Sequence, residues 1–295
     1  MYSVVIPRVV FIFYGECMSS VKLPYKRLAF LEMLAFWKGE VRNKDLENQF
    51  GITRQQAYKD FIQYQELHPH HLLKLDKACY VFAEKKLPHY FSGGLDDFLS
   101  WLESGHFVLP HTLPNACATR LNVPERRVSR QVVAMLVKAI QQKLRVEVNY
   151  ISLSHPENEG RIISPHTIVK AGSRFHVRGY CEKSQGFRDF VLSRFREEAE
   201  IEGPSPYSID QDEAWQTSVT LVLAADPRLS PAQQHVLAHD YQMENNQLCI
   251  ATRAALADYL LREMQVNTKY LDGKPEAQQL VLVNRDDIKA WLFKS

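Results

Sequence analysis

The stretch NKDLENQFGITRQQAYKDFIQY, residues 43–64, decides the fold of the first part of the chain. Asn43 is a favourable N-cap for a short helix, and Gly51 suits the left-handed conformation in which such a helix ends. Thr53 can cap a second helix, in which apolar residues recur three and four positions apart. Two helices joined by a glycine-containing turn form a helix–turn–helix.

The flanking sequence extends this motif on both sides. Residues 24–39 place apolar side chains at helical spacing, which predicts a first helix. Residues 72–74 and 79–83 are short apolar runs separated by Asp76 and Lys77, which predicts a β-hairpin. Three helices followed by a hairpin are typical of a winged helix–turn–helix, which we expect over residues 18–90.

The second helix of the motif carries side chains that can read DNA. In a helix–turn–helix the N-terminal half of this helix enters the major groove, where Arg contacts guanine, Gln contacts adenine and Lys contacts phosphate. Lysines of the hairpin suit contacts with the DNA backbone. The predicted DNA-binding residues are Thr53, Arg54, Gln55, Gln56, Tyr58, Lys59, Lys74 and Lys77. The plainer alternative is that the basic residues only solvate a surface helix.

The rest of the chain divides into three further segments. Residues 91–126 contain a helix expected at Leu95–Glu103 and are interpreted as a connecting segment with apolar surface to spare for dimerisation. Residues 127–205 begin with a helix and continue with four strands, which predicts a small, strongly curved β-barrel. Residues 206–295 alternate strand and helix, which predicts a small α+β sandwich that dimerises. The expected fold class is multidomain α+β, with a winged helix, an SH3- or Sm-like barrel and this sandwich.

Polar side chains gather on the expected strands of the barrel, Arg145–Ser152, Ile162–Lys170, Arg174–Cys181 and Phe187–Arg196. Alternation puts His176 and Arg178 on one face of their strand, and antiparallel pairing with the next strand would bring Arg188 and Arg194 close to them. Guanidinium groups beside aromatic rings suit phosphate binding and base stacking. The predicted ligand-binding residues are Tyr150, Ser152, Arg161, His166, His176, Arg178, Arg188 and Arg194. Alternatively, the arginines form surface salt bridges and the histidines are structural.

These strands carry a family resemblance. The runs NYIS (149–152), RIISPH (161–166), RFHVRGYC (174–181) and FRDFVLSR (187–194) resemble a WYL domain, with Phe175-His176-Val177 in place of the Trp-Tyr-Leu triplet. Residues 18–295 as a whole resemble WYL-domain transcription regulators, nearest the repressors that accompany BREX and CBASS anti-phage systems. The resemblance implies a homodimer that represses a phage-defence operon through operator DNA. It also implies that the WYL domain senses a nucleotide or oligonucleotide effector.

Composition and charge limit the possible partners. The chain has 295 residues, of which 45% are hydrophobic and 24% charged, values typical of a folded protein with more than one domain. Residues 18–90 carry 12 basic against 8 acidic residues, and residues 126–202 carry 14 against 9. Residues 203–295 carry 8 basic against 12 acidic residues. This distribution suggests anionic partners for the first two segments only.

Cysteine usage and the first residues bear on location. The five cysteines are scattered and contain no CxxC pair, which favours the cytoplasm over an oxidising compartment. Residues 1–17 are apolar but too short to span a bilayer, and they are interpreted as an extension before a start at Met18. We expect no membrane partner, no cofactor and no metal, since the run His68–His71 is interpreted as a solvated turn.

Three functions remain compatible with the sequence. The first is a ligand-responsive homodimeric repressor that binds an inverted-repeat operator. The second is an enzyme that processes nucleic acid, although the sequence contains no P-loop, GxGxxG, HExxH or GxSxG motif. The third is a passive DNA-binding or scaffold protein whose middle domain only dimerises. We expect the first, a regulator without catalytic residues.

Overall fold

The structure is a computed structural model that describes residues 23–76, 78–108, 123–124, 126–153, 156, 159–268 and 274–292. The chain divides into two compact units, residues 1–116 and 117–295, and each is described by itself. The expected extension at residues 1–17 and the predicted DNA contact of Lys77 lie outside the described residues. None of the described helices combines the length and the apolar character that crossing a membrane requires.

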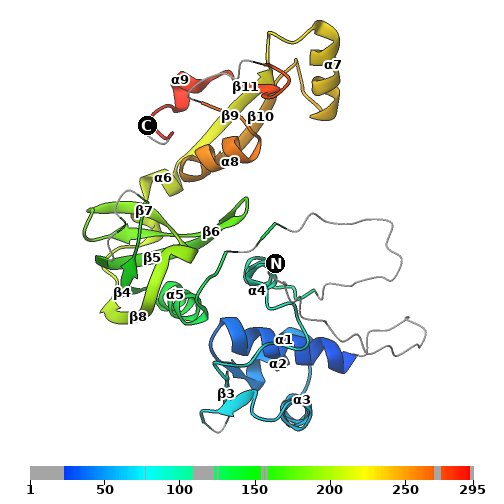
Figure 1. The fold of residues 1–295 in the computed structure, drawn as a ribbon, viewed down its shortest axis with the longest axis vertical. Helices are drawn as coiled ribbons and strands as arrows, with labels where there is room; N and C mark the ends of the chain where they lie inside the picture. The colour runs from blue at the N-terminus through cyan, green and yellow to red at the C-terminus, as the bar shows by residue number, and fades with distance from the viewer. Residues whose placement is uncertain are drawn as a thin grey trace, which may run out of the picture. The chain divides into compact units, whose positions relative to one another are not determined.

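The first unit is a winged helix (Figure 1). Its elements are α1 (Leu23–Trp37), β1 (Val41–Arg42), α2 (Asn43–Phe50), α3 (Arg54–Leu67), β2 (Leu72–Lys74), β3 (Cys79–Phe82) and α4 (Leu95–Ser104). The strands form an antiparallel sheet in the order β1-β3-β2. The hairpin expected from the sequence is confirmed as β2 and β3, and β1 adds a third strand to it.

Local hydrogen bonds fix the turn between α2 and α3. Gly51 ends α2 with φ of 62°, and its N–H donates to the carbonyl of Glu47 at 2.9 Å. Thr53 caps α3, since its hydroxyl oxygen accepts the backbone N–H of Gln56 at 3.2 Å. Both predicted helix boundaries are confirmed, and both follow from residue types that favour these conformations.

The start of α2 corrects one expectation. Asn43 is not the N-cap but the first helical residue, and it is buried. Arg42 is the N-cap, and the Asp45 carboxylate accepts its backbone N–H at 2.7 Å. Arg42 also pairs with Cys79 in the sheet, which keeps its backbone extended, so the helix begins one residue later than the sequence suggested.

Two buried carboxylates attach α3 to α1. Asp60 accepts hydrogen bonds from Arg27 Nε at 2.6 Å and from Arg27 Nη2 at 3.0 Å, with both side chains buried. Glu32 accepts the Tyr64 hydroxyl at 2.5 Å. Burial raises the pKa of Glu32, although this bond and others oppose the shift. Removing one partner of a buried ion pair typically costs about 3–5 kcal/mol, so these contacts fix the position of α3.

α4 packs on the winged helix and is not a spacer. Phe98 of α4 is fully buried, and the Trp101 ring lies 5.3 Å from the Phe30 ring of α1. Trp101 Nε1 donates a hydrogen bond to Gln49 Oε1 at 2.8 Å. The expectation that this segment keeps spare apolar surface is therefore wrong for Phe98, because this side chain is already fully buried within the single chain.

The second unit begins with α5 (Arg130–Gln142), which packs on a five-stranded antiparallel sheet. The strands are β4 (Leu144–Tyr150), β5 (Glu159–Ala171), β6 (Arg174–Cys181), β7 (Gly186–Val191) and β8 (Phe195–Pro204), in the order β7-β6-β5-β4-β8. The single strand expected at 187–196 is interrupted by the 3-10 helix η1 (Leu192–Arg194). The barrel was an incorrect expectation, because β7 and β8 remain at opposite edges of the sheet that the described residues form.

β5 and β6 approach closely at a β-bulge. The pairing register shifts between Pro165 and Thr167, and Gly179 lies opposite the bulge. A Cβ on Gly179 would lie only 2.5 Å from the carbonyl oxygen of Ser164, so only glycine fits there. The extra residue of the bulge is His166, one of the predicted ligand-binding residues.

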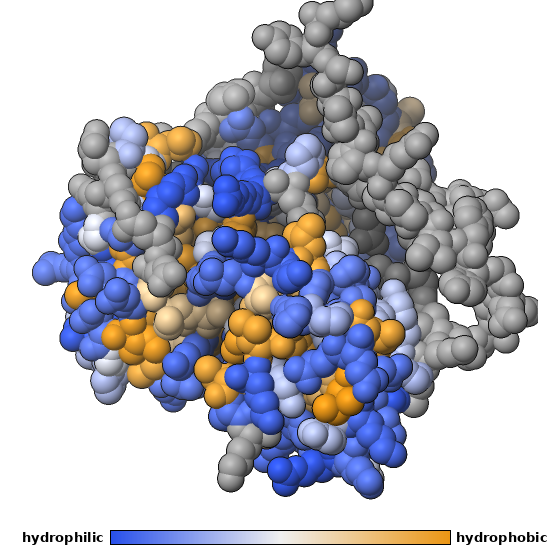
Figure 2. Space-filling view, turned by 60° about the horizontal axis from the view of Figure 1, so that its bottom comes forward, coloured by the Kyte–Doolittle hydropathy of each residue, from blue (hydrophilic) through white to orange (hydrophobic). Residues whose placement is uncertain are grey.

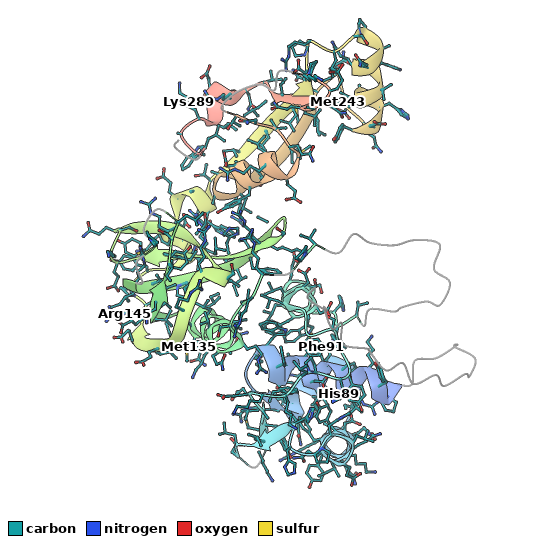
Figure 3. All side chains as sticks on the ribbon, in the orientation of Figure 1. His89, Phe91, Met135, Arg145, Met243 and Lys289 are labelled. Atoms are coloured by element: carbon teal, nitrogen blue, oxygen red, sulfur yellow. The ribbon has the colours of Figure 1, made fainter. Side chains whose placement is uncertain are left out.

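The remaining residues form a second sheet with helices. The elements are η2 (Ile209–Gln211), α6 (Glu213–Gln216), β9 (Ser218–Ala225), α7 (Pro231–Asp240), β10 (Leu248–Arg253), η3 (Ala254–Leu256), α8 (Ala257–Glu263), β11 (Leu280–Leu282) and α9 (Arg285–Ile288). The antiparallel strand order is β10-β9-β11, around a core that includes Leu221, Leu223 and Leu261. Met243 and Lys289 mark this domain in Figure 3, and Met135 and Arg145 mark the preceding one. The expected alternation of strands and helices is confirmed.

Candidate nucleic-acid interface and ligand site

α3 has one polar and one buried face. Arg54, Gln55 and Lys59 are exposed near its start, and the Tyr58 side chain is 50% exposed. Its buried residues are Ala57, Asp60, Phe61 and Tyr64. The buried face attaches the helix to α1, so the N-terminal half is presented to solvent in the way that insertion into a major groove requires.

Gln56 is separated from this exposed group. It is half-buried, and its Nε2 donates to Asp60 Oδ1 at 3.0 Å, the carboxylate that also pairs with Arg27. Its amide therefore supports the position of α3 in this structure. The residues that α3 presents together are Thr53, Arg54, Gln55, Tyr58 and Lys59.

The wing presents both charged and apolar side chains. Lys74 is exposed at the end of β2, between Leu73 and Leu75, which are 51% and 66% exposed. Figure 2, which turns the lower end of Figure 1 forward, shows orange hydrophobic patches between hydrophilic side chains. A lysine among apolar side chains at this position suits contact with the sugar–phosphate backbone.

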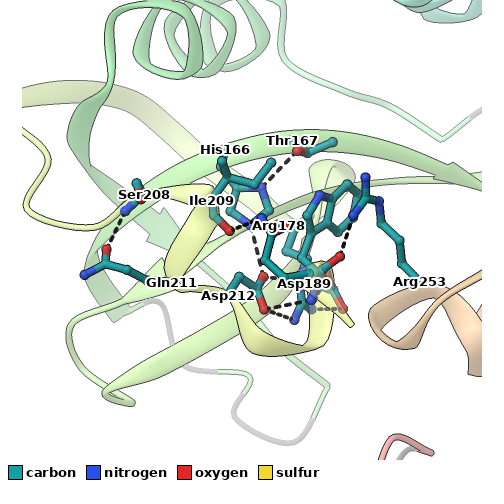
Figure 4. Close-up of polar contacts among 11 residues, drawn as sticks. His166, Thr167, Arg178, Asp189, Ser208, Ile209, Gln211, Asp212 and Arg253 are labelled. Atoms are coloured by element: carbon teal, nitrogen blue, oxygen red, sulfur yellow. Dashed lines mark hydrogen bonds and ion pairs between the residues drawn. The ribbon is translucent and has the colours of Figure 1, made fainter. Parts of the chain in front are cut away.

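A buried ion-pair network occupies the centre of the predicted ligand site (Figure 4). Arg178 donates to Asp212 through Nε at 2.6 Å and through Nη2 at 2.9 Å, and its Nη1 donates to Asp189 at 3.1 Å. His166 Nε2 lies 3.1 Å from the same Asp212, and its Nδ1 lies 2.9 Å from Thr167 Oγ1. Carboxylates of the chain itself therefore neutralise Arg178 and engage His166.

The two carboxylates of this network are electrostatically different. Burial alone would raise the pKa of Asp212, but hydrogen bonds from His166 and Arg178 lower it to about 2. Burial raises the pKa of Asp189, and its ion pair with Arg178 only partly opposes this shift. Tyr259 of α8 donates its hydroxyl proton to Asp189 at 3.2 Å. The network thus joins the five-stranded sheet to both α6 and α8 of the C-terminal domain.

The register between β6 and β7 corrects one part of the prediction. Arg178 pairs with Asp189, and Gly179 pairs with Arg188. Because directly opposed residues of neighbouring strands share a face, Asp189 lies on the face of Arg178 and Arg188 lies on the other face. The expected convergence of Arg188 with His176 and Arg178 is therefore wrong, since it depended on a register one residue away.

The charge of Arg194 does act on His176. His176 is 5% exposed, and its buried Nδ1 has no hydrogen-bond partner among the described residues. Burial, reinforced by the charges of Arg174, Arg194 and Arg126, lowers the pKa of His176 to about 4. The three arginine charges thus favour a neutral imidazole at this position.

The remaining predicted residues are Tyr150 of β4, Arg161 of β5 and Ser152. The Tyr150 ring is buried edge-on against Phe190 and Phe195, and its hydroxyl oxygen accepts the backbone N–H of Val191 at 3.1 Å. The Arg161 guanidinium lies 5.8 Å from the Tyr150 ring. Ser152 is half-buried just beyond β4. Tyr150 thus serves the packing of the sheet, separate from the Arg178 network.

Sequence reasoning missed the acidic half of this site. Asp189 directly follows Arg188 in the expected strand Phe187–Arg196, but it is not among the predicted ligand-binding residues. Asp212 lies 34 residues after Arg178, in a segment with no periodic pattern, and Tyr259 lies in another domain. The one available signal was the excess of basic residues on the strands, which requires carboxylates or an anion nearby.

Three family models match successive parts of the chain. The BrxR transcriptional regulator winged helix-turn-helix domain matches residues 24–104, and the WYL domain matches residues 131–200. The BrxR transcriptional regulator C-terminal dimerization domain matches residues 218–288. The first match extends over α4, in agreement with the packing of this helix on α1.

Curated relatives match the chain over most of its length. The DNA-binding transcriptional repressor CapW of Pseudomonas aeruginosa is 34% identical over 274 residues, covering 90% of each chain. CapW of Escherichia coli (strain KTE188) is 34% identical over 277 residues, which are 90% of this chain and 91% of that protein. CapW of Stenotrophomonas maltophilia is 27% identical over 273 residues, again 90% of this chain and 91% of that protein.

Among solved structures, the proteasome accessory factor B/C (PafBC) of Arthrobacter aurescens aligns with 96% of this chain and 51% of its own, at 16% identity and a TM-score of 0.27. A likeness at this level supports no argument about the fold. The sequence relatives and the three matching domains agree with one another and with the described structure. The chain therefore belongs to the family of transcriptional regulators that combine a BrxR-type winged helix, a WYL domain and a BrxR-type C-terminal domain, the family that includes the CapW proteins.

Proposed function

We propose that this protein is a homodimeric transcriptional repressor that binds an inverted-repeat operator and is controlled by a nucleotide or nucleic-acid effector. In this proposal residues 18–90 bind DNA, residues 127–205 sense the effector and residues 206–295 dimerise. The observation that carries the proposal is the exposed polar face of α3, which the buried pair Arg27–Asp60 holds in position.

DNA recognition rests on side chains at the start of α3. Arg54 and Gln55 can make bidentate contacts with base edges, whereas Lys59 and Lys74 suit phosphate. One such helix reads only a few base pairs, and two helices related by a two-fold axis read both halves of an inverted repeat. The match of residues 218–288 to a dimerization domain supports this symmetry.

Effector control rests on the surroundings of His176. The charges of Arg174 and Arg194 reach this buried imidazole, and a phosphate-bearing ligand would compensate them. The CapW relatives are repressors by name, which supports repression as the outcome of DNA binding. The resemblance to regulators beside BREX and CBASS systems supports a phage-defence operon as the target and the cytoplasm as the location.

The proposal is tested by DNA binding and by a reporter. The wild-type protein is titrated against DNA from upstream of its own gene, with shuffled DNA as the competitor, and a reporter measures transcription from the same DNA. We expect specific binding and repression, both lost in a variant with Arg54, Gln55 and Lys59 all changed to Ala. The control variant, Lys138→Ala, removes an exposed cation on α5 and should bind like wild type. Equal binding of specific and shuffled DNA would contradict the proposal.

Two further measurements separate the alternative functions. If the protein is a nucleic-acid enzyme, incubation of the bound DNA with Mg²⁺ will shorten or modify it, whereas a repressor leaves it intact. If the protein is a passive scaffold, oligonucleotides and cyclic nucleotides will leave its melting temperature unchanged. A ligand that binds the native state raises the melting temperature, and the stabilisation grows with the logarithm of the ratio of its concentration to its Kd.

A further inference from the structure

A cavity of about 480 Å³ lies where α8 packs against the β5–β6 hairpin. Val169 and Ala171 of β5 line one wall. Thr252, Leu256 and Tyr259, from β10, η3 and α8, line the other. Lys170, Gly172, Leu260 and Glu263 complete the lining, so the walls are mainly apolar or aromatic and include one cation and one carboxylate.

Strand register identifies the polar groups at the border of this cavity. Val169 pairs with His176, and Ala171 pairs with Arg174. Because cross-strand partners share a face, His176 and Arg174 lie on the same face of the hairpin as the two lining residues. The His176 ring also lies 5.0 Å from the ring of Tyr259, so it contacts both walls.

His176 is a polar group that this structure leaves incomplete. His176 is only 5% exposed, and its Nδ1 has no hydrogen-bond partner in the described part of the chain. A buried nitrogen without a partner is destabilising, so native structures rarely retain one without a reason. His176 does not itself line the cavity, but it is next to two residues that do, Val169 by strand pairing and Tyr259 by ring contact.

Three cationic side chains contribute to the lowered pKa of the same histidine. The charges of Arg126, Arg174 and Arg194 all act on His176. Within the described residues, no hydrogen bond or ion pair links these three guanidinium groups to a carboxylate. They differ in this from Arg178, which Asp189 and Asp212 neutralise, so they can receive an external anion. Guanidinium groups match phosphate in geometry and charge.

We propose that this cavity binds a phosphate-bearing planar aromatic ring, of the nucleoside monophosphate class, with the ring against Tyr259 and the phosphate toward Arg174, which pairs with the lining residue Ala171. The inference rests on the proposed function and makes it more specific, because it places the effector between two domains and not on the five-stranded sheet alone. The occupant contacts the sheet through Val169 and the C-terminal domain through Tyr259. The affinity for this occupant therefore depends on the distance between α8 and the β5–β6 hairpin. Ligand binding is in this way coupled to the position of the C-terminal dimerisation domain relative to the sheet.

Calorimetric titration of the full-length protein tests the proposal. The probes are the four common nucleoside 5′-monophosphates, the corresponding nucleosides and inorganic phosphate. We expect at least one monophosphate to bind at least tenfold more tightly than its nucleoside and than inorganic phosphate, because ring and phosphate both contribute. Arg174→Ala should reduce the affinity for that monophosphate to that of the nucleoside. Leu256→Trp, which fills the cavity, should weaken binding of the monophosphate and the nucleoside alike by at least tenfold.

Matched controls and the operator titration separate the possible failures. Val283→Trp adds the same ring at a side chain that is 52% exposed, and Lys138→Ala removes an exposed cation; both should bind the monophosphate like wild type. All variants should retain operator affinity without ligand, which also shows that they fold. If no monophosphate binds, or if Leu256→Trp binds it unchanged, the cavity is not the site, although operator binding still supports the repressor. If wild type fails to bind the operator, the proposed function itself is wrong.

Discussion

Arg178 of β6 and Asp212, which directly precedes α6, form a buried two-point ion pair, with Nε–Oδ2 of 2.6 Å and Nη2–Oδ1 of 2.9 Å. The pair connects the five-stranded sheet to the start of the C-terminal domain. Their side chains are 8% and 2% exposed, and His166 shares the same carboxylate. This arrangement assigns Arg178 and His166 to domain attachment, whereas the buried Nδ1 of His176 has no hydrogen-bond partner among the described residues.

Asp212→Ala should destabilise the second unit by about 3–5 kcal/mol, because it leaves Arg178 buried beside Asp189 alone. Chemical denaturation followed by tryptophan fluorescence measures the change. Asp286→Ala is the matched control, because its pair with Lys289 spans 3.7 Å between exposed side chains, and such pairs contribute at most about 1 kcal/mol. Equal stability of the two variants would show that the buried pair contributes nothing.

Arg54→Ala should weaken operator binding by about 1–3 kcal/mol and relax the preference at one base pair, because the bidentate contact with a base edge is lost. Competition between the operator and its single-base variants measures both effects. Lys138→Ala is the control. A variant with unchanged affinity and unchanged base preference would remove Arg54 from the recognition surface.

Lys59→Ala should weaken binding to all DNA sequences by a similar factor and flatten the salt dependence. A protein releases counterions from the DNA when it binds, and each phosphate contact contributes to this release. Loss of one phosphate contact therefore reduces the magnitude of the slope of log affinity against log salt concentration by about 0.9. Titrations at several salt concentrations give this slope for wild type and variant. An unchanged slope would mean that Lys59 does not contact phosphate.

The stability of the second unit should decrease as the pH falls from 6.5 to about 4, the interval between the ordinary pKa of histidine and the lowered pKa of His176. In this interval His176 binds a proton in the unfolded chain but stays neutral in the folded protein. The free energy of unfolding therefore decreases by up to about 1.4 kcal/mol for each pH unit of acidification. His176→Phe should remove this part of the pH dependence, whereas His235→Phe, at an exposed site on α7, should retain it. The measurement is urea denaturation at a series of pH values, and equal slopes for both variants would contradict the prediction.

The protein should protect two DNA half-sites whose centres lie about 34–36 Å apart or at a multiple of this distance, because each protomer inserts one α3 into a major groove on the same side of the duplex. Hydroxyl-radical footprinting gives the spacing, and light scattering should report twice the 34.1 kDa of one chain. A protein with the mass of one chain and a single protected half-site would exclude the dimer.

The sequence by itself determined the DNA-binding domain to a large extent. Gly51 and Thr53 set the turn between α2 and α3 through local backbone preferences, which depend on few distant contacts. Period-two alternation similarly located most strands, and the quoted runs identified the WYL domain, which the family match confirms. Asn43 shows the limit of such local rules, because pairing of Arg42 in the sheet moved the helix start by one residue.

Only the tertiary structure decided which groups meet in the candidate ligand site. Alternation along β6 places His176 and Arg178 on one face of the sheet, but it does not determine which residues of β7 pair with them. The actual register differs by one residue from the expected register. It therefore places Asp189 opposite Arg178 and puts Arg188 on the other face. The partner of Arg178 from the other domain, Asp212, follows it by 34 residues in the chain, and Tyr259 closes the site from α8. Such contacts arise from the packing of whole domains. The pattern of residues within a single strand contains no information about this packing.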